Sequence, residues 1–177
     1  MHSATSRCAG CNQVSAPLGI LVAGIGNIFL GDDGFGSEVI RRVPEHVAAP
    51  GVRIVDYGIR GVHLAYDLLD GCAALVLVDA IPSRGAPGTL HVFAADHESL
   101  TAASGLDGHA MDPQAVFATL TALGGTPPDT VVIGCEAASL EEGIGLSDAV
   151  EAAVPGAIQA VIDAVADLSA RSAVRGG

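Results

Sequence analysis

The chain has 177 residues, of which half are hydrophobic and 3% aromatic, and its formal net charge at pH 7 is -12. That length suits one domain with a substantial core, and a composition rich in Ala, Val, Leu and Gly is typical of α/β layer proteins. The acidic surplus argues against nucleic acid and anionic membranes as partners, because their phosphates repel a negatively charged surface.

Residues 1–18 are rich in Ser, Ala, Thr and Asn and lack hydrophobic periodicity, which predicts a flexible tail outside the fold. The tail contains Cys8 and Cys11, a lone C-x-x-C pair that could bind a metal, be redox-active or be incidental. The four cysteines suggest no disulfide framework, and we find neither a leader sequence nor an apolar run long enough to span a bilayer. We therefore expect a soluble, cytoplasmic protein.

Residues 19–42 predict a strand, a turn and a helix. The apolar run 20–23 leads into a glycine-rich turn and the adjacent acids Asp32 and Asp33, and helical periodicity begins near Asp33. In open parallel sheets, ligands bind beyond the carboxyl ends of the strands, so this turn is a candidate site.

The middle of the chain predicts three more strands and one helix. Residues 51–56 form a second strand ending at Asp56, and residues 61–69 an amphipathic helix. Residues 73–79 are an almost uninterrupted apolar run ending at Asp79, which is typical of a central strand buried on both faces. Residues 88–93 predict a strand antiparallel to the others, because the connection 81–87 is too short for a crossover helix.

The last third of the chain predicts a loop, a helix, a strand and a terminal helical region. Residues 94–111 are expected to form a loop over the end of the sheet, followed by a helix from 112 to 123 and a strand at 130–135. A terminal helical region runs from 146 to about 169, broken or kinked at Pro155. We therefore expect a single three-layer α/β domain over 19–170, with a mixed five-stranded twisted sheet, helices on both faces and a tail at 171–177.

Two predicted strands carry acids at their carboxyl ends. In the usual 2-1-3 order of a doubly wound sheet, the first and third strands are neighbours, and Asp33 and Asp79 face each other at the topological switch point. The loop before Asp112 offers His97 or His109 as a third ligand. Carboxylates with an imidazole suit nickel, zinc or a similar ion.

Structural roles are the alternative for several of these residues. Asp32 is expected to stabilise its turn or cap a helix, which leaves Asp33 as the ligand. Asp79 could cap a turn after its strand, and His109 could be a surface histidine. Glu136 could support the site from the end of the last strand, and Asp56 could stabilise its own turn.

A dinucleotide-binding turn is a second functional alternative. Gly24 and Gly26 match the first two glycines of that fingerprint, but Phe29 stands in place of the third. The two adjacent acids would also face a pyrophosphate that prefers backbone amides. Asp56 could imitate the ribose-binding acid, which keeps this interpretation open.

The motifs G-x-G-N, D-D-x-x-G and V-D-A, followed by an isolated loop histidine, resemble those of the [NiFe]-hydrogenase maturation endopeptidases. The resemblance covers nearly all of residues 19–168, includes G-I-G-L-S at 143–147, and departs from the family's D-G-G-T turn at 56–61. It implies that Asp33, Asp79 and His109 form a metal-binding catalytic site. It also implies a protease that removes the C-terminal extension of a hydrogenase large-subunit precursor after nickel insertion.

The resemblance further implies that nickel arrives with the substrate, and that other divalent metals can substitute for it. We expect the protein to act as a monomer. The sequence contains no G-x-S-x-G elbow, no H-E-x-x-H helix and no Cys-His nucleophile signature, which agrees with this chemistry. A non-enzymatic nickel chaperone with the same three ligands remains an alternative.

Overall fold

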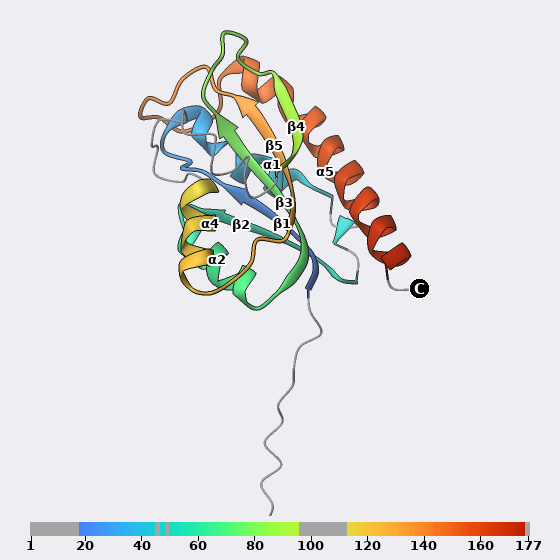
Figure 1. Cartoon of the computed structure of the whole chain (residues 1–177). Coiled ribbons are helices and arrows are strands. Elements are labelled where there is room, and N and C mark those ends of the chain that lie inside the picture. Colours follow the sequence, from blue (N-terminus) through green and yellow to red (C-terminus); the bar gives the residue numbers. More distant parts are fainter. Residues whose placement is uncertain (1–17, 45–46, 49, 96–112, 176–177) are drawn as a thin grey trace, which may run out of the picture.

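Five strands form one mixed sheet in the computed structural model, which describes residues 18–44, 47–48, 50–95 and 113–175 (Figure 1). In chain order the elements are β1 (Leu18–Ile25), the 3-10 helix η1 (Gly31–Gly34), α1 (Phe35–Arg42), β2 (Val52–Gly58), α2 (Gly61–Leu69), β3 (Cys72–Ile81), β4 (Leu90–Ala95), α4 (Pro113–Ala122), β5 (Asp129–Glu136) and α5 (Asp148–Arg175). The strand order is β2-β1-β3-β5-β4, so the predicted 2-1-3 order and the mixed five-stranded sheet are confirmed.

β4 is the antiparallel strand that was predicted for residues 88–93. It pairs with β5 from Leu90 opposite Cys135 to Ala95 opposite Thr130, whereas β1, β2, β3 and β5 are mutually parallel. The connection from β3 is too short to carry the chain back to the other end of the sheet. β4 therefore runs back along its neighbour.

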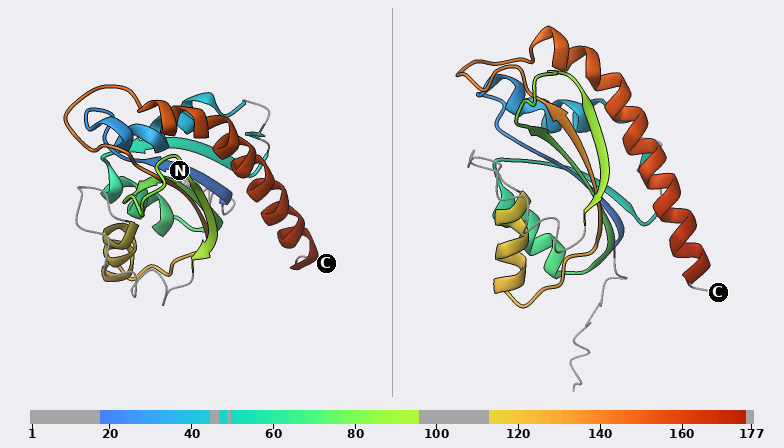
Figure 2. Two further views of the ribbon diagram at one scale, coloured as in Figure 1. Left: turned by 90° about the horizontal axis from the view of Figure 1, so that it is seen from above. Right: turned by 45° about the horizontal axis from the view of Figure 1, so that its top comes forward.

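Helices cover both faces of the sheet, as predicted (Figure 2). α1 and α5 pack on one face together with Val76 and Val78 of β3. α2 and α4 pack on the other face together with Leu75 and Leu77. Successive residues of β3 point to opposite layers, and both layers are covered by helices, which explains the continuous apolar run.

α5 is one helix that continues through Pro155, so a break there, one of the two predicted forms, is wrong, while a kink at the proline stays a prediction. Val154 and Ala157, on either side of the proline, are fully buried against the sheet. Tertiary packing thus offsets the loss of one backbone hydrogen bond at the proline.

The end of α5 also differs from the prediction. The helix extends to Arg175 and so includes most of the segment 171–177 that was expected to be a tail. After Gly156 the sequence has no Gly or Pro before Gly176, so nothing local stops the helix earlier.

By length and composition alone, α5 is able to cross a membrane over Asp148–Arg171, contrary to the expectation from sequence. A single such helix is weak evidence for a span, because core helices of soluble proteins pass the same test. In this fold Val150, Val161 and Leu168 of α5 pack into the core beside the sheet.

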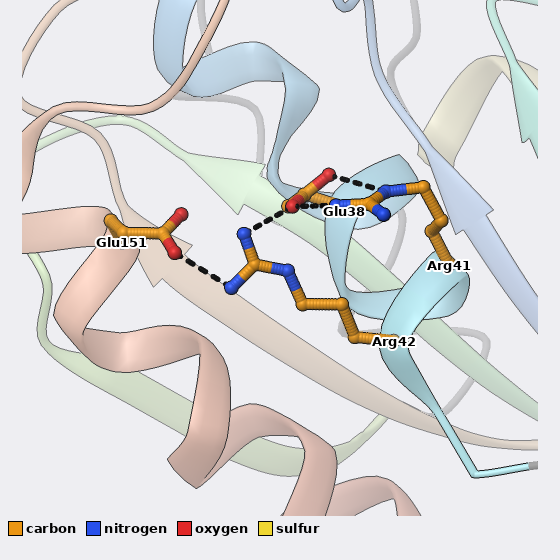
Figure 3. Close-up of polar contacts among 4 residues, drawn as sticks. All are labelled: Glu38, Arg41, Arg42 and Glu151. Atoms are coloured by element: carbon orange, nitrogen blue, oxygen red, sulfur yellow. Dashed lines mark hydrogen bonds and ion pairs between the residues drawn. The ribbon is translucent and has the colours of Figure 1, made fainter.

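Charged side chains join α1 to α5 at their solvent edge (Figure 3). Arg42 forms ion pairs with Glu38 in its own helix and, at 2.6 Å, with Glu151 of α5. Glu38 also pairs with Arg41 at 2.5 Å. These side chains remain partly exposed, so the pairs orient the two helices but add little stability.

Candidate active site

The carboxyl ends of β1 and β3 lie side by side. Gly24 of β1 is opposite Val78 of β3 in the parallel register, so the turn after β1 and Asp79 start from the same edge of the sheet. Asp79 is only 5% exposed. A carboxylate at this edge occupies the topological switch point at which α/β proteins bind ligands.

The turn after β1 closes on itself. Gly26 has a φ of +128°, and a Cβ at this position would lie 1.9 Å from the carbonyl oxygen of Asp33, so only glycine fits. The backbone N–H of Asn27 donates a hydrogen bond to Asp33 Oδ2 at 2.7 Å, and Asn27 Oδ1 accepts one from the N–H of Phe29 at 3.0 Å. The half-buried Asp33 carboxylate is thereby held in place by its own turn.

α1 begins directly against the two strand ends. A Cβ on Gly36 would lie 2.2 Å from Ile25 O and 2.5 Å from Val78 O, so the first turn of α1 touches the backbone of both strands. Asp33 precedes Gly36 by about one helical turn, and Asp79 directly follows Val78. The two acids therefore belong to one small region, although their joint binding of a metal stays a prediction.

The chemistry available in this region is that of carboxylates. Asp33 and Asp79 offer oxygen ligands for a divalent cation and acceptors for the proton of a water molecule. Either role needs ionised carboxylates and a substrate group that reaches the edge of the sheet.

The predicted third ligand, His109, lies outside the described residues, as does the alternative His97. Within the part of the chain that the structure describes, no group of three His, Cys, Asp or Glu side chains is arranged to hold a metal ion. His63 is exposed on α2, and His91 contacts Glu136 at 2.9 Å. The assignment of His109 therefore stays a prediction.

Asp32, unlike its neighbour Asp33, is buried, with 1% of its surface exposed. Its Oδ2 accepts hydrogen bonds from the N–H groups of Ala138 (2.7 Å) and Ser139 (3.0 Å) and from Ser147 Oγ (2.9 Å), and its Oδ1 accepts one from the N–H of Ser147 (2.6 Å). Burial raises the pKa of Asp32, but these hydrogen bonds outweigh it and bring the pKa below its ordinary value. Asp32 is thus a structural anion.

Backbone hydrogen bonds complete this connection between two distant segments. The N–H of Gly31 donates to Gly143 O at 3.0 Å, the N–H of Gly143 to Phe29 O at 2.9 Å, and the N–H of Asp32 to Ser139 O at 3.1 Å. Figures 1 and 2 show the orange segment between β5 and α5 beside the blue turn after β1. The D-D-x-x-G and G-I-G-L-S motifs therefore form one structural unit.

The sequence predicts that Asp32 stabilises a turn or caps a helix. It does not indicate that the hydrogen-bond donors to Asp32 lie 106 to 115 residues away in the chain. The available signal was a serine, Ser147, at the start of the predicted terminal helical region, together with a second acid beside the expected ligand. Neither signal says that the two segments meet.

A second buried acid, Glu136, lies at the end of β5. Its Oε2 accepts hydrogen bonds from the N–H groups of Arg84 (2.8 Å) and Ala86 (3.1 Å), and its Oε1 lies 2.9 Å from His91 Nε2. The hydrogen bond from Arg84 and the contact with His91 lower the pKa of Glu136 despite its burial. Glu136 therefore holds the connection between β3 and β4, which follows Asp79, and this agrees with the predicted supporting role.

Asp56 stabilises its own turn, which is one of the two roles predicted for it, the other being that of a ribose-binding acid. Its Oδ1 accepts hydrogen bonds from the N–H of Gly58 at 2.9 Å and from Ser37 Oγ at 2.8 Å. Because Ser37 belongs to α1, Asp56 also joins the end of β2 to the helix that starts at the candidate site.

Neither described cysteine is activated as a nucleophile. Cys72 and Cys135 are free, and burial raises the pKa of each thiol to about 11. Both thiols stay protonated at neutral pH and are poor nucleophiles. Cys8 and Cys11 lie outside the described residues.

A family model described as hydrogenase maturation protease matches residues 37–164, which is most of the chain. The chain belongs to the hydrogenase maturation protease family. It is therefore a peptidase, and the family suspected from its motifs is confirmed. The matched span begins shortly after Asp33 and includes Asp79 and His109.

Individual relatives of the protease agree with this assignment. It is 34% identical to the hydrogenase expression/formation protein HupD of Rhodobacter capsulatus over 87% of this chain and 73% of that protein. It is 30% identical to the hydrogenase 2 maturation protease of Escherichia coli over 82% of this chain and 90% of that protein. The structure of the maturating endopeptidase HybD from E. coli superposes with a TM-score of 0.70 at 29% identity, covering 84% of this chain and 93% of that one.

Proposed function

We propose that this protease removes the C-terminal extension of a [NiFe]-hydrogenase large-subunit precursor after nickel has been inserted. The observation that carries the proposal is the family match over residues 37–164. The motifs of the turn after β1 and of the end of β3 support the nickel-iron class of hydrogenase.

In this proposal Asp33, Asp79 and His109 bind the nickel ion that the precursor brings. Three such ligands leave positions of the metal open, and groups of the substrate fill them. The burial of Asp79 and the hydrogen bond from Asn27 to Asp33 support this role, because both carboxylates are held at the same edge of the sheet. The free protease is then largely metal-empty, and other divalent metals can substitute for nickel.

The reaction is the hydrolysis of one peptide bond. The oxygen of water bonds to the carbonyl carbon, the C–N bond breaks, and the leaving amine takes up a proton. Asp33 and Asp79 hold the precursor in register, and a carboxylate of this pair accepts the proton that water loses. A substrate anchored in this way requires no covalent intermediate with the enzyme.

The proposed setting is the cytoplasm, and the protease acts as a monomer on its protein substrate. The net charge of -12 supports the view that neither nucleic acid nor a membrane is a partner. The free thiols of Cys72 and Cys135 fit a reducing compartment.

The test mixes the purified protease with large-subunit precursor from the same organism, matured with or without nickel. Mass spectrometry follows the release of the C-terminal peptide. We expect release only from the nickel-loaded precursor. Equal cleavage of the two precursors would contradict nickel recognition and would indicate a hydrolase with its own resident metal.

Substitutions separate the site from the scaffold. Asp79→Asn and Asp33→Asn remove a charge at nearly constant shape, so each should abolish processing with little change in melting temperature. Asp70→Asn, at the exposed end of α2, is the matched control and should process normally. Binding of nickel-loaded precursor without shortening would favour the chaperone alternative, and tight binding of a labelled dinucleotide would favour the nucleotide-binding one.

A further inference from the structure

Four large apolar side chains stand exposed on the turns around Asp33. Ile28 and Phe29 follow β1 and are 48% and 61% exposed, Ile59 follows β2 and is 61% exposed, and Ile144 precedes α5 and is 81% exposed. We call these four residues the apolar rim. Side chains this exposed add little to the core, so their contribution to stability does not explain them.

The rim residues are neighbours through the backbone, although they come from three segments. The N–H of Gly143, next to Ile144, donates to Phe29 O at 2.9 Å. The carbonyl oxygen of Gly58, next to Ile59, accepts a hydrogen bond from the N–H of Gly26 at 3.1 Å. The three turns therefore meet where the first of them carries Asp33.

The rim is also pre-formed. The buried carboxylate of Asp32 fixes both the turn that bears Phe29 and the segment that bears Ile144. Asp56 accepts a hydrogen bond from the N–H of Gly58 and so orders the third turn. A surface whose backbone is already ordered loses less conformational entropy when a partner binds, which strengthens association.

We infer that the apolar rim is the docking surface for the segment of the precursor that flanks the scissile bond, and that this segment is apolar. This inference rests on the proposed function, because the turns that carry the rim meet beside Asp33 of the candidate active site. Anchoring there would hold the peptide bond in register with Asp33 and Asp79.

Electrostatic repulsion distinguishes between the possible binding partners of the apolar rim. Exposed Glu141 and Glu142 lie on the segment that carries Ile144, and the whole chain has a net charge of -12. A second copy of this acidic chain and an anionic lipid surface would both be repelled there. A neutral, apolar stretch of polypeptide meets no such penalty.

The test measures precursor processing by Phe29→Ser and Ile144→Ser, alone and combined. Each substitution should raise KM for the nickel-loaded precursor about tenfold, while kcat stays within about twofold, because binding contacts rather than reacting groups are lost. Leu123→Ser is the matched control: Leu123 is 45% exposed but follows α4, at the opposite end of the parallel strands, and should leave KM unchanged. Ile144→Val keeps an apolar side chain and should restore near-normal KM, even if a serine variant is poorly folded.

The outcomes separate the inference from the proposed function. Normal KM in the doubly substituted protein, with processing intact, would overturn the rim as a docking surface and leave the proposed function standing. Absence of processing by the unsubstituted protease would overturn both. Rim-dependent dimers in sedimentation, or rim-dependent binding to vesicles of phosphatidylcholine and phosphatidylserine, would identify a different occupant and also overturn it.

Discussion

Asp32 and Asp33 are adjacent in the chain but have opposite environments. Asp32 is buried and accepts four hydrogen bonds from the segment before α5, so its oxygens are already occupied by the protein. Asp33 is half-buried and accepts a hydrogen bond from Asn27 in its own turn. Of these two neighbours, Asp32 is saturated by hydrogen bonds from the protein and serves as scaffold, whereas Asp33 is the acid that we propose binds the substrate's metal.

The first prediction concerns Asp32. Asp32→Asn turns an acceptor toward which several N–H groups point into a donor, so the free energy of unfolding should fall by about 3 kcal/mol. Chemical denaturation measures this loss. Asp70→Asn, on an exposed carboxylate, should change it by less than about 0.5 kcal/mol, and a similar loss in both variants would contradict the assigned role.

The second prediction separates steric clash from backbone strain. Gly26→Ala would bring a Cβ to 1.9 Å from Asp33 O in a left-handed conformation, whereas Gly71 has a φ of +90° with nothing within 4 Å of its Cβ position. Gly71→Ala should therefore cost about 1 kcal/mol of conformational strain. Gly26→Ala should cost at least about 3 kcal/mol, because clash is added to strain. Thermal melts compare the two, and equal losses would show that the turn relaxes.

At the scale of elements, α5 does more than cover the sheet. It follows Ser147, whose N–H and Oγ both donate to Asp32, so the helix starts from the acid that anchors the candidate site. Its buried face then runs along the sheet, and Glu151 pairs with Arg42 of α1 (Figure 3). The position of the helix and the shape of the turn after β1 therefore depend on each other.

The third prediction concerns the exposed Pro155 inside α5. Pro155→Ala supplies an N–H able to donate to the carbonyl oxygen of Glu151 and removes a poor helix former, while the unfolded chain gains entropy. The net effect should be a rise of about 2 kcal/mol in the free energy of unfolding. Gln159→Ala, on the exposed side of the same helix, should stay within about 0.5 kcal/mol. A loss of stability in the proline variant would mean that the proline ring itself is needed for packing.

At the scale of the whole molecule, electrostatics act in two directions. The net charge of -12 weakens the compact state through self-repulsion, and mild acidification relieves part of it. Buried acids act in the opposite direction, because acids whose pKa is lowered by folding stabilise the native state only while ionised. Stability below neutral pH depends on which effect is larger.

The fourth prediction isolates one of these acids. Folding lowers the pKa of Glu136, so its contribution is present above the ordinary pKa of about 4.3 and is lost as pH falls through the lower folded value. Glu136→Gln should therefore be less stable than the unsubstituted protein at neutral pH, and the difference should shrink at about pH 4 and below. Urea denaturation across pH measures both proteins. A constant difference would show that the lost stability is steric.

Much of this fold could be predicted from local patterns. The bounds of α2, Gly61–Leu69, agree with the prediction, and the run ending at Asp79 is the central strand β3, because both features arise from side-chain periodicity within one element. The antiparallel direction of β4 followed from a short connection. Placing Asp33 and Asp79 at neighbouring strand ends followed from the usual strand order, while their role in binding metal still awaits experiment.

Beyond the strand order, only the tertiary structure decided which atoms of distant segments meet. The bonds from Ala138 and Ser147 to Asp32, and the approach of Gly36 to Val78, join positions whose separation leaves no periodic trace in the sequence. Packing also carried α5 through Pro155, where local propensity predicted a break or a kink. Local propensity is a property of neighbouring residues, whereas burial and hydrogen bonding across the fold depend on the whole chain.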